Sequence, residues 1–132
     1  AKFYIDEGLP EEGIKVYEQA IEYLPNSVLL HLSYADFLET LNRPKDAEVI
    51  YQKLLEVQNE TLVWIQYMFF AQRVFGVKHA RKIFLKAHKQ PTCTYHIYVA
   101  SAMMEFYQNK DPELARKIFD RAFQQKFGKE TE

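Results

Sequence analysis

Ala80-Arg81-Lys82-Ile83-Phe84 is one of four similar stretches that decide the fold. The others are Gly13-Ile14-Lys15-Val16-Tyr17, Ala47-Glu48-Val49-Ile50-Tyr51 and Ala115-Arg116-Lys117-Ile118-Phe119. Each begins with a tiny residue and ends with an aromatic one, and Ala20, Leu54, Ala87 or Ala122 follows three places later. Residues at this spacing share one face of a helix. The stretches recur at spacings of 34, 33 and 35 residues, which predicts four repeats of one helical unit.

The small-then-aromatic pattern predicts a face on which helices dock. A tiny residue lets a neighbouring helix approach closely, and the aromatic side chain one turn away fills the gap beside it. Aromatic residues of the preceding helices complete this face. The predicted repeat core is Gly13, Tyr17, Ala47, Tyr51, Trp64, Tyr67, Ala80, Phe84, Ala87, Tyr98, Ala115, Phe119 and Ala122.

A second set of helices is predicted before the last three stretches, at residues 28–41, 62–74 and 95–107. They align through Leu30-His31, Val63-Trp64 and Ile97-Tyr98, and the first repeat keeps only a stub of this helix. The helix at 62–74 is apolar almost all round, which is typical of a helix between neighbours. Trp64, Tyr67 and Phe70 are therefore interpreted as core and not as a ligand-binding box.

The predicted fold class is all-α, an α-solenoid of antiparallel helix pairs in a right-handed superhelical stack. No run alternates with period two, so no strands are expected. We expect a single segment over 1–132, with repeats at about 1–25, 26–58, 59–90 and 91–128, taken from a longer array. Pro10 and Pro112 mark helix starts, whereas Pro25, Pro44 and Pro91 are expected between helices. Asn59-Glu60-Thr61 is interpreted as a helix cap.

Composition and local sequence argue against several classes of protein. With 48% apolar residues the chain can bury a core, and its single cysteine excludes an internal disulfide framework. Neither a secretory signal nor an apolar run of membrane-spanning length is expected. Cys93-x-x-His96 offers two zinc ligands where a structural site needs four. We therefore predict no catalytic residues, no cofactor, no metal and no small-molecule substrate.

A period near 34 with this pattern is similar to the tetratricopeptide repeat (TPR) and to the half-a-tetratricopeptide (HAT) repeat. Trp64, Tyr67, Tyr98, Ala80-Arg81 and Ala115-Arg116 match the HAT type. The amino-acid sequence at residues 61–68, 80–84 and 94–99 resembles that of the suppressor-of-forked family, the large HAT subunit of cleavage stimulation factor. This resemblance covers about residues 60–120. The first two repeats depart from it, because Ile14 and Glu48 stand where the arginine is expected.

The resemblance implies a nuclear scaffold in pre-mRNA cleavage and polyadenylation, which homodimerises through its later HAT repeats. The implied partners are other protein subunits of an RNA-processing complex. The family's downstream tail, which carries an RNA-binding subunit, is absent from these residues. A TPR-type peptide-binding adaptor and a HAT protein of splicing or ribosome biogenesis stay open as alternatives.

Charge divides the chain, since residues 1–60 hold 5 basic and 12 acidic residues and residues 61–132 hold 12 and 6. A solvated face, a protein contact and RNA phosphates can each explain the basic residues, with protein contact favoured over RNA. The final helix pair should also leave apolar surface open, where it docks onto another repeat or another chain. The predicted partner-binding residues are Lys78, Arg81, Lys82, Lys86, Lys89, Arg116, Lys117, Arg121, Tyr95, Met103, Phe106, Tyr107, Phe123 and Phe127.

Overall fold

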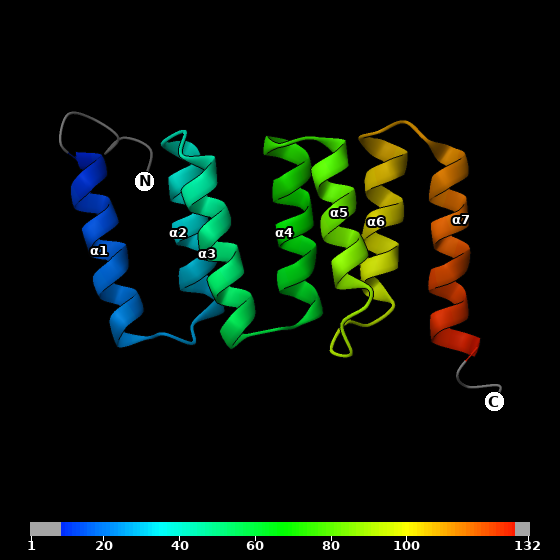
Figure 1. The fold of residues 1–132 in the computed structure, drawn as a ribbon, viewed down its shortest axis with the longest axis horizontal. Helices are drawn as coiled ribbons and strands as arrows, with labels where there is room; N and C mark the ends of the chain where they lie inside the picture. The colour runs from blue at the N-terminus through cyan, green and yellow to red at the C-terminus, as the bar shows by residue number, and fades with distance from the viewer. Residues whose placement is uncertain (1–8, 129–132) are drawn as a thin grey trace. The chain divides into compact units, whose positions relative to one another are not determined.

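The computed structural model describes residues 9–128, with side chains from 10 to 126. Within these residues it contains helices and no strands, so the all-α repeat class predicted from the sequence is confirmed. Figure 1 labels the helices. They are α1 (Leu9–Tyr23), α2 (Val28–Thr40), α3 (Pro44–Val57), α4 (Thr61–Val74), α5 (Val77–Ala87), α6 (His96–Tyr107), α7 (Pro112–Phe123) and a π-helical turn, η2 (Gln124–Gly128).

The chain divides into two compact units, residues 1–58 and 59–132. The division falls between the second and third predicted repeats. The N-terminal unit carries 5 basic and 11 acidic residues, whereas the C-terminal unit carries 12 and 7. We call α2, α4 and α6 the A helices and α1, α3, α5 and α7 the B helices, since each A helix is followed by the B helix of the same repeat.

Close packing in the N-terminal unit depends on Gly13. A Cβ atom at this position would lie 2.5 Å from Cζ of Phe37, so the ring of α2 reaches the backbone of α1 only because the residue is glycine. Tyr17, one turn further along α1, stacks on Tyr34 with ring centroids 5.2 Å apart. Ser27 caps the N-terminus of α2, and its hydroxyl accepts a hydrogen bond of 3.2 Å from the amide of Leu30. The small-then-aromatic pair thus packs α1 against α2.

The three turns between A and B helices each contain a residue with a positive φ angle. Asn42, Gly76 and Lys110 have φ angles of 62°, 106° and 56°, and they lie 34 residues apart. Asn42 and Gly76 follow the C-terminal capping residues of α2 and α4, and Lys110 comes two residues after that of α6. A positive φ at such a position turns the chain out of the helix. Pro44 then opens α3 within its first turn, and Pro112 does the same for α7. The expectation that Pro44 lies between helices is therefore wrong, because its fixed φ suits a first helical turn.

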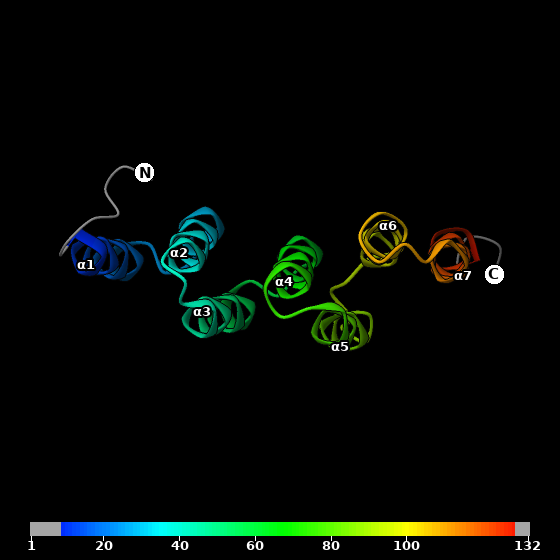
Figure 2. The same ribbon diagram turned by 90° about the horizontal axis from the view of Figure 1, so that it is seen from above.

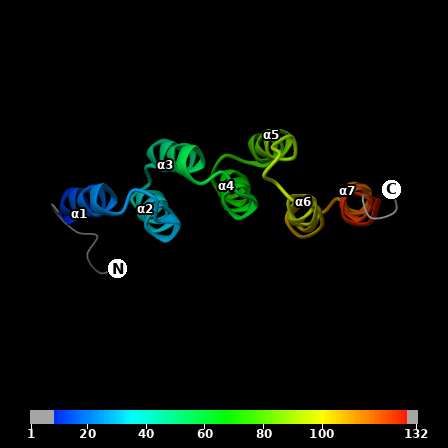
Figure 3. The same ribbon diagram turned by 90° about the horizontal axis from the view of Figure 1, so that it is seen from below.

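The C-terminal unit is built around α4 and α6. Helices α4, α5 and α6 pack against one another, and α7 packs against α6. Figures 2 and 3 show these helices end-on from opposite sides, with α4, α5 and α6 at the corners of a triangle. Buried residues occur around much of α4, namely Val63, Trp64, Tyr67, Met68, Phe70 and Ala71. Helix α4 is apolar on several sides because it packs on two neighbours within this unit.

The cap of α4 falls at Glu60, within the predicted cluster Asn59-Glu60-Thr61, although the Glu60 side chain makes no capping hydrogen bond. The Asn59 Oδ1 instead accepts hydrogen bonds of 2.9 Å from Trp64 Nε1 and 2.9 Å from Thr92 Oγ1. Asn59 therefore ties the start of α4 to the loop that precedes α6.

Most of the predicted repeat-core residues lie buried, but Phe119 does not. Its side chain is 46% exposed, so its assignment to the buried core is wrong. The equivalent Phe84 on α5 is half-buried, because Tyr98 of α6 meets its ring edge-on at 5.5 Å between centroids. No further A helix follows α7 among the described residues. Of the other predicted core residues, Gly13 and Tyr17 are half-buried, and Ala47, Tyr51, Trp64, Tyr67, Ala80, Ala87, Tyr98, Ala115 and Ala122 are buried.

Candidate protein-interaction surfaces

The predicted basic residues lie on or beside two B helices of the C-terminal unit. All of their side chains are exposed. Lys78, Arg81, Lys82 and Lys86 are on α5, Lys89 follows it, and Arg116, Lys117 and Arg121 are on α7. Repeat spacing places Arg116 and Lys117 at the positions of Arg81 and Lys82.

Arg81 differs from the other basic residues because it is held by a buried acid. Its Nε donates to Oε2 of Glu105 at 3.0 Å, and its Nη2 donates to Oε1 at 2.8 Å. The Glu105 side chain is 1% exposed, whereas that of Arg81 is 45% exposed. The hydrogen bond from Arg81 to Glu105 raises the arginine pKa further, and burial opposes this rise. Two donors of Arg81 thus serve the fold, and its role in partner binding stays a prediction.

Glu105 also links α6 to α4. Its Oε1 accepts a hydrogen bond of 3.0 Å from Asn109 Nδ2, and the amides of Asn109 and Gln72 pair at 2.9 and 3.3 Å. A buried carboxylate must have such donors, because an unpaired charge is costly inside a protein. The network therefore joins side chains from α4, α5 and α6. The network was not predicted from the sequence, although Glu105 occupies the repeat position of the buried Leu38 and Ala71.

An apolar band crosses α6 and α7, and we call it the end surface. One part is a depression of about 330 Å³ lined by Met103, Phe106, Tyr107 and Phe119, among others. A second depression, of about 150 Å³, lies between Tyr95, Phe119 and Phe123. Phe119 lines both, so the two depressions form one surface along the helix pair. The end surface comprises Tyr95, Val99, Met103, Phe106, Tyr107, Phe119 and Phe123.

Large apolar side chains of the end surface are open to solvent. Met103 is 42% exposed, Phe106 49%, Tyr107 59% and Phe123 64%. Tyr95 is half-buried, and the Nζ of Lys126 lies 4.9 Å from its ring centroid. The side chain of Phe127, the remaining predicted contact, lies outside the described residues. Contiguous apolar surfaces of this kind are typical of protein-interaction sites.

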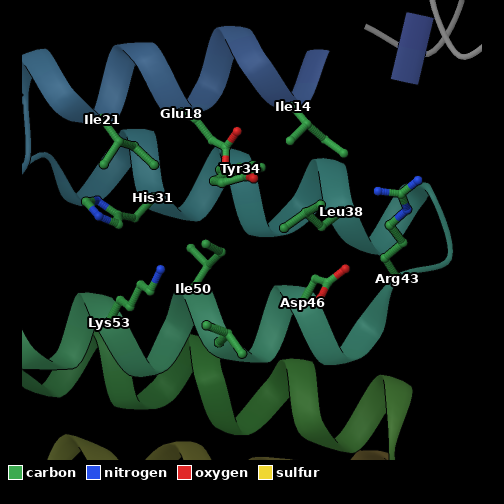
Figure 4. A pocket seen from close by; sticks show the side chains of 11 residues that line it. Ile14, Glu18, Ile21, His31, Tyr34, Leu38, Arg43, Asp46, Ile50 and Lys53 are labelled. Atoms are coloured by element: carbon green, nitrogen blue, oxygen red, sulfur yellow. The ribbon is translucent and has the colours of Figure 1, made fainter. Parts of the chain in front are cut away.

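A different pocket, of about 370 Å³, lies between the helices of the N-terminal unit (Figure 4). Glu18 and Asp46 face its interior together with Arg43 and Lys53, around apolar side chains such as Ile50. Arg43 also pairs with Glu11 at 2.6 Å. The lining therefore mixes both charge signs. None of the predicted partner-binding residues lies here.

Tyr34 lines the same pocket. Burial raises its pKa, and the negative charges of Glu18 and Asp46 add to the rise, whereas Arg43 opposes it. Burial and the two acids therefore favour the neutral phenol over the phenolate.

The cysteine and histidines have local structural roles. The Cys93 thiol is half-buried, and burial raises its pKa, whereas interaction with Thr61 opposes the rise. His96 accepts or donates at 2.9 Å with Thr94 Oγ1, and its ring stacks on Tyr95. No cluster of three or more potential metal ligands occurs among the residues described. Within the same residues, no helix has the length and apolar character needed to cross a membrane.

Helix pairs of about 34 residues, a small-then-aromatic docking face and repeated left-handed turns define a helical-repeat protein of the HAT class. The family model described as "Suppressor of forked protein (Suf)" matches residues 1–132. The chain belongs to the suppressor of forked family.

Three relatives illustrate the similarity. Cleavage stimulation factor subunit 77 of Arabidopsis thaliana is 37% identical over 120 residues, which cover 91% of this chain and 16% of that protein. Protein suppressor of forked of Drosophila melanogaster is 42% identical over 113 residues, covering 83% and 15%. The mRNA 3'-end-processing protein RNA14 of Cryptococcus neoformans is 46% identical over 65 residues, covering 49% and 6%. The chain thus spans about a sixth of the first two.

Proposed function

We propose that this chain is a non-catalytic protein–protein scaffold of the nuclear machinery that cleaves and polyadenylates pre-mRNA. The family membership supports the process, because relatives are named as a cleavage stimulation factor subunit and as mRNA 3'-end-processing proteins. The end surface supports the scaffold role. Its partners are other protein subunits of that machinery.

We further propose that the end surface mediates self-association, with a second copy of the chain as its occupant. Repeat spacing places Phe119 and Phe123 where Phe84 and His88 lie on α5. The rings of Phe84 and His88 both contact Tyr98 of the next A helix, at centroid distances of 5.5 and 5.9 Å. The side chains at the same positions of α7 therefore form a surface suited to aromatic residues of another helix.

RNA phosphate contact is the less favoured explanation of the basic residues. Single-strand binders combine cations with exposed aromatic rings on which bases stack. In the C-terminal unit the exposed aromatic residues lie on the end surface, next to other apolar side chains such as Met103. Most of the predicted cations lie elsewhere on α5 and α7, so rings and cations are not combined in one site. Opposite net charges of the two units also favour pairing between protein surfaces.

Sedimentation equilibrium of the 132-residue chain tests the self-association. We expect the wild type to shift from monomer to dimer as concentration rises, and Phe119→Ser combined with Phe123→Ser to stay monomeric. Leu29→Ser is the matched control, since Leu29 is 76% exposed on α2 and outside the end surface. A wild-type chain that stays monomeric up to high concentration would contradict the proposal. So would a dimer that the paired serine variant leaves intact.

Association with the processing machinery needs a separate test. Immobilised chain should retain cleavage and polyadenylation subunits from nuclear extract treated with nuclease, and labelled RNA should not bind it at moderate salt. Retention that disappears with nuclease treatment would instead indicate an RNA-mediated contact.

A further inference from the structure

The C-terminal unit contains a second concave surface, distinct from the end surface, which we call the α5–α7 groove. It has a volume of about 510 Å³ and lies between α5, α6 and α7. Phe84, Leu85, Leu114 and Ile118 supply apolar lining, and Arg81, Lys117 and Arg121 supply cations. Leu85 is 53% exposed, so a large apolar side chain is open to a ligand there.

Repeat spacing shows that this groove corresponds to the pocket of the N-terminal unit. Residues of α1 and α2 align with those of α5 and α6 at an offset of 67, and residues of α3 align with α7 at 68. Eight lining positions of the two concavities then coincide. Written as N-terminal/C-terminal pairs they are Ile14/Arg81, Glu18/Leu85, Tyr34/Ser101, Leu38/Glu105, Asp46/Leu114, Val49/Lys117, Ile50/Ile118 and Lys53/Arg121.

The two concavities differ in chemistry although repeat geometry supplies both. Two acids of the N-terminal pocket are replaced by leucines, at Leu85 and Leu114, and its Val49 is replaced by Lys117. The one acid of the α5–α7 groove, Glu105, is buried and bonded to Arg81. The C-terminal concavity is therefore more apolar in its lining and more positive in its charge.

Two cations of the groove are available to a ligand. No residue in the described part of the chain forms an ion pair with Lys117 or Arg121. Glu113 and Asp120 are carried by the same helix, but neither lines the groove. Burial lowers the pKa of His88, which follows α5, and Lys89 and Arg121 lower it further. The field at this end of the groove is thus positive.

We propose that the α5–α7 groove binds a peptide segment of a partner protein in which large aliphatic side chains are flanked by carboxylates. The aliphatic side chains pack on Leu85, Leu114 and Ile118, which removes apolar surface from water. The carboxylates pair with Lys117 and Arg121, and a guanidinium can hold a carboxylate through two hydrogen bonds.

The geometry favours such a peptide over RNA. The only aromatic side chain of the groove, Phe84, is half-buried, with Tyr98 meeting it edge-on and His88 at 5.3 Å between ring centroids. Its ring is therefore not an open platform for a base, and single-stranded nucleic acid gains much of its affinity from such platforms. An apolar lining beside two cations suits a short amphipathic peptide better.

Fluorescence anisotropy of the full 132-residue chain tests the proposal. The probe is a fluorescein-labelled peptide with two central leucines between flanking glutamates. One comparison peptide has serines for the leucines, a second has lysines for the glutamates, and a labelled oligouridylate represents RNA. We expect saturable binding of the first peptide, and at least about tenfold weaker binding of the other three probes.

Variants locate the binding. Lys117→Glu combined with Arg121→Glu should weaken the peptide at least about tenfold, as should Leu85→Ser. Lys82→Glu, an exposed α5 control outside the groove, should change affinity by less than about twofold. Phe119→Ser should also leave peptide binding unchanged. The proposal for the groove and the proposal for the end surface can therefore be refuted independently. Absence of saturable peptide binding, tighter binding of oligouridylate, or equal affinities of the groove variants and wild type would overturn the proposal.

Discussion

Replacing Arg81 or Glu105 should destabilise the C-terminal unit strongly. Glu105 is 1% exposed and accepts two hydrogen bonds from Arg81 and one from Asn109. Arg81→Met leaves this carboxylate buried with one of those three donors. Hydrogen bonds to charged groups contribute about 1.5–3 kcal/mol each, and losing one partner of a buried ion pair costs about 3–5 kcal/mol.

The expected cost lies below the range for a fully buried ion pair. Arg81 is 45% exposed, so water screens the pair and can replace part of the guanidinium. We therefore expect Arg81→Met to lower the free energy of unfolding by about 2–3 kcal/mol, and Glu105→Gln by about 1–2 kcal/mol. The double variant should cost less than the sum of the two by about 1–2 kcal/mol, because both changes remove the same interaction.

Urea unfolding followed by tryptophan fluorescence measures these costs. Trp64 is the single tryptophan of the chain and is buried in α4, so its signal reports the C-terminal unit. Arg116→Met is the matched control, since Arg116 holds the position of Arg81 on α7 and no described residue forms an ion pair with it. It should cost less than about 0.5 kcal/mol. A coupling between Arg81 and Glu105 below about 0.5 kcal/mol would refute the reasoning.

Three further predictions concern the same unit. Burial, Lys89 and Arg121 lower the pKa of His88, so its neutral form stabilises the fold above the unfolded pKa of about 6.5, and this contribution is lost as pH falls toward the folded value. His88→Gln should therefore lose less stability than wild type between pH about 7.5 and 5.5 in urea titrations, and an equal loss would contradict this. Gly76→Ala should lower the free energy of unfolding by about 1–3 kcal/mol, because φ 106° and ψ −178° suit glycine alone; a loss below about 0.3 kcal/mol would count against it. Burial raises the pKa of Cys93, so iodoacetamide should alkylate the native thiol at least about tenfold more slowly than the urea-unfolded thiol, and mass spectrometry would reveal equal rates if the thiol were open.

The helices could be predicted from the sequence because the repeats specify them several times over. Predicted bounds of 28–41, 62–74 and 95–107 compare with Val28–Thr40, Thr61–Val74 and His96–Tyr107. Apolar periodicity predicts such elements well, whereas their ends depend on local capping. Lysine as a residue type does not predict the positive φ angle of Lys110. However, Lys110 follows Gly76 at the same spacing as Gly76 follows Asn42. Repeat spacing would therefore have located that turn.

The candidate surfaces were less predictable because composition does not reveal which side chains meet. Glu105 looks like a solvated charge, but its repeat position belongs to the buried Leu38 and Ala71, so an acid there requires a partner such as Arg81. Phe119 was assigned to the core because its repeat equivalents, Tyr51 and Phe84, fit that pattern. Its exposure depends on the absence of a covering A helix among the described residues, which no local pattern encodes.

Hydrogen–deuterium exchange of the chain at low and high concentration tests the central proposal most directly, that protein contact occurs through the end surface. Added protection at high concentration should fall on peptides from residues 95–107 and 112–126, and Phe119→Ser with Phe123→Ser should abolish it. Protection confined to α1–α3, or exchange that does not depend on concentration, would contradict the proposal.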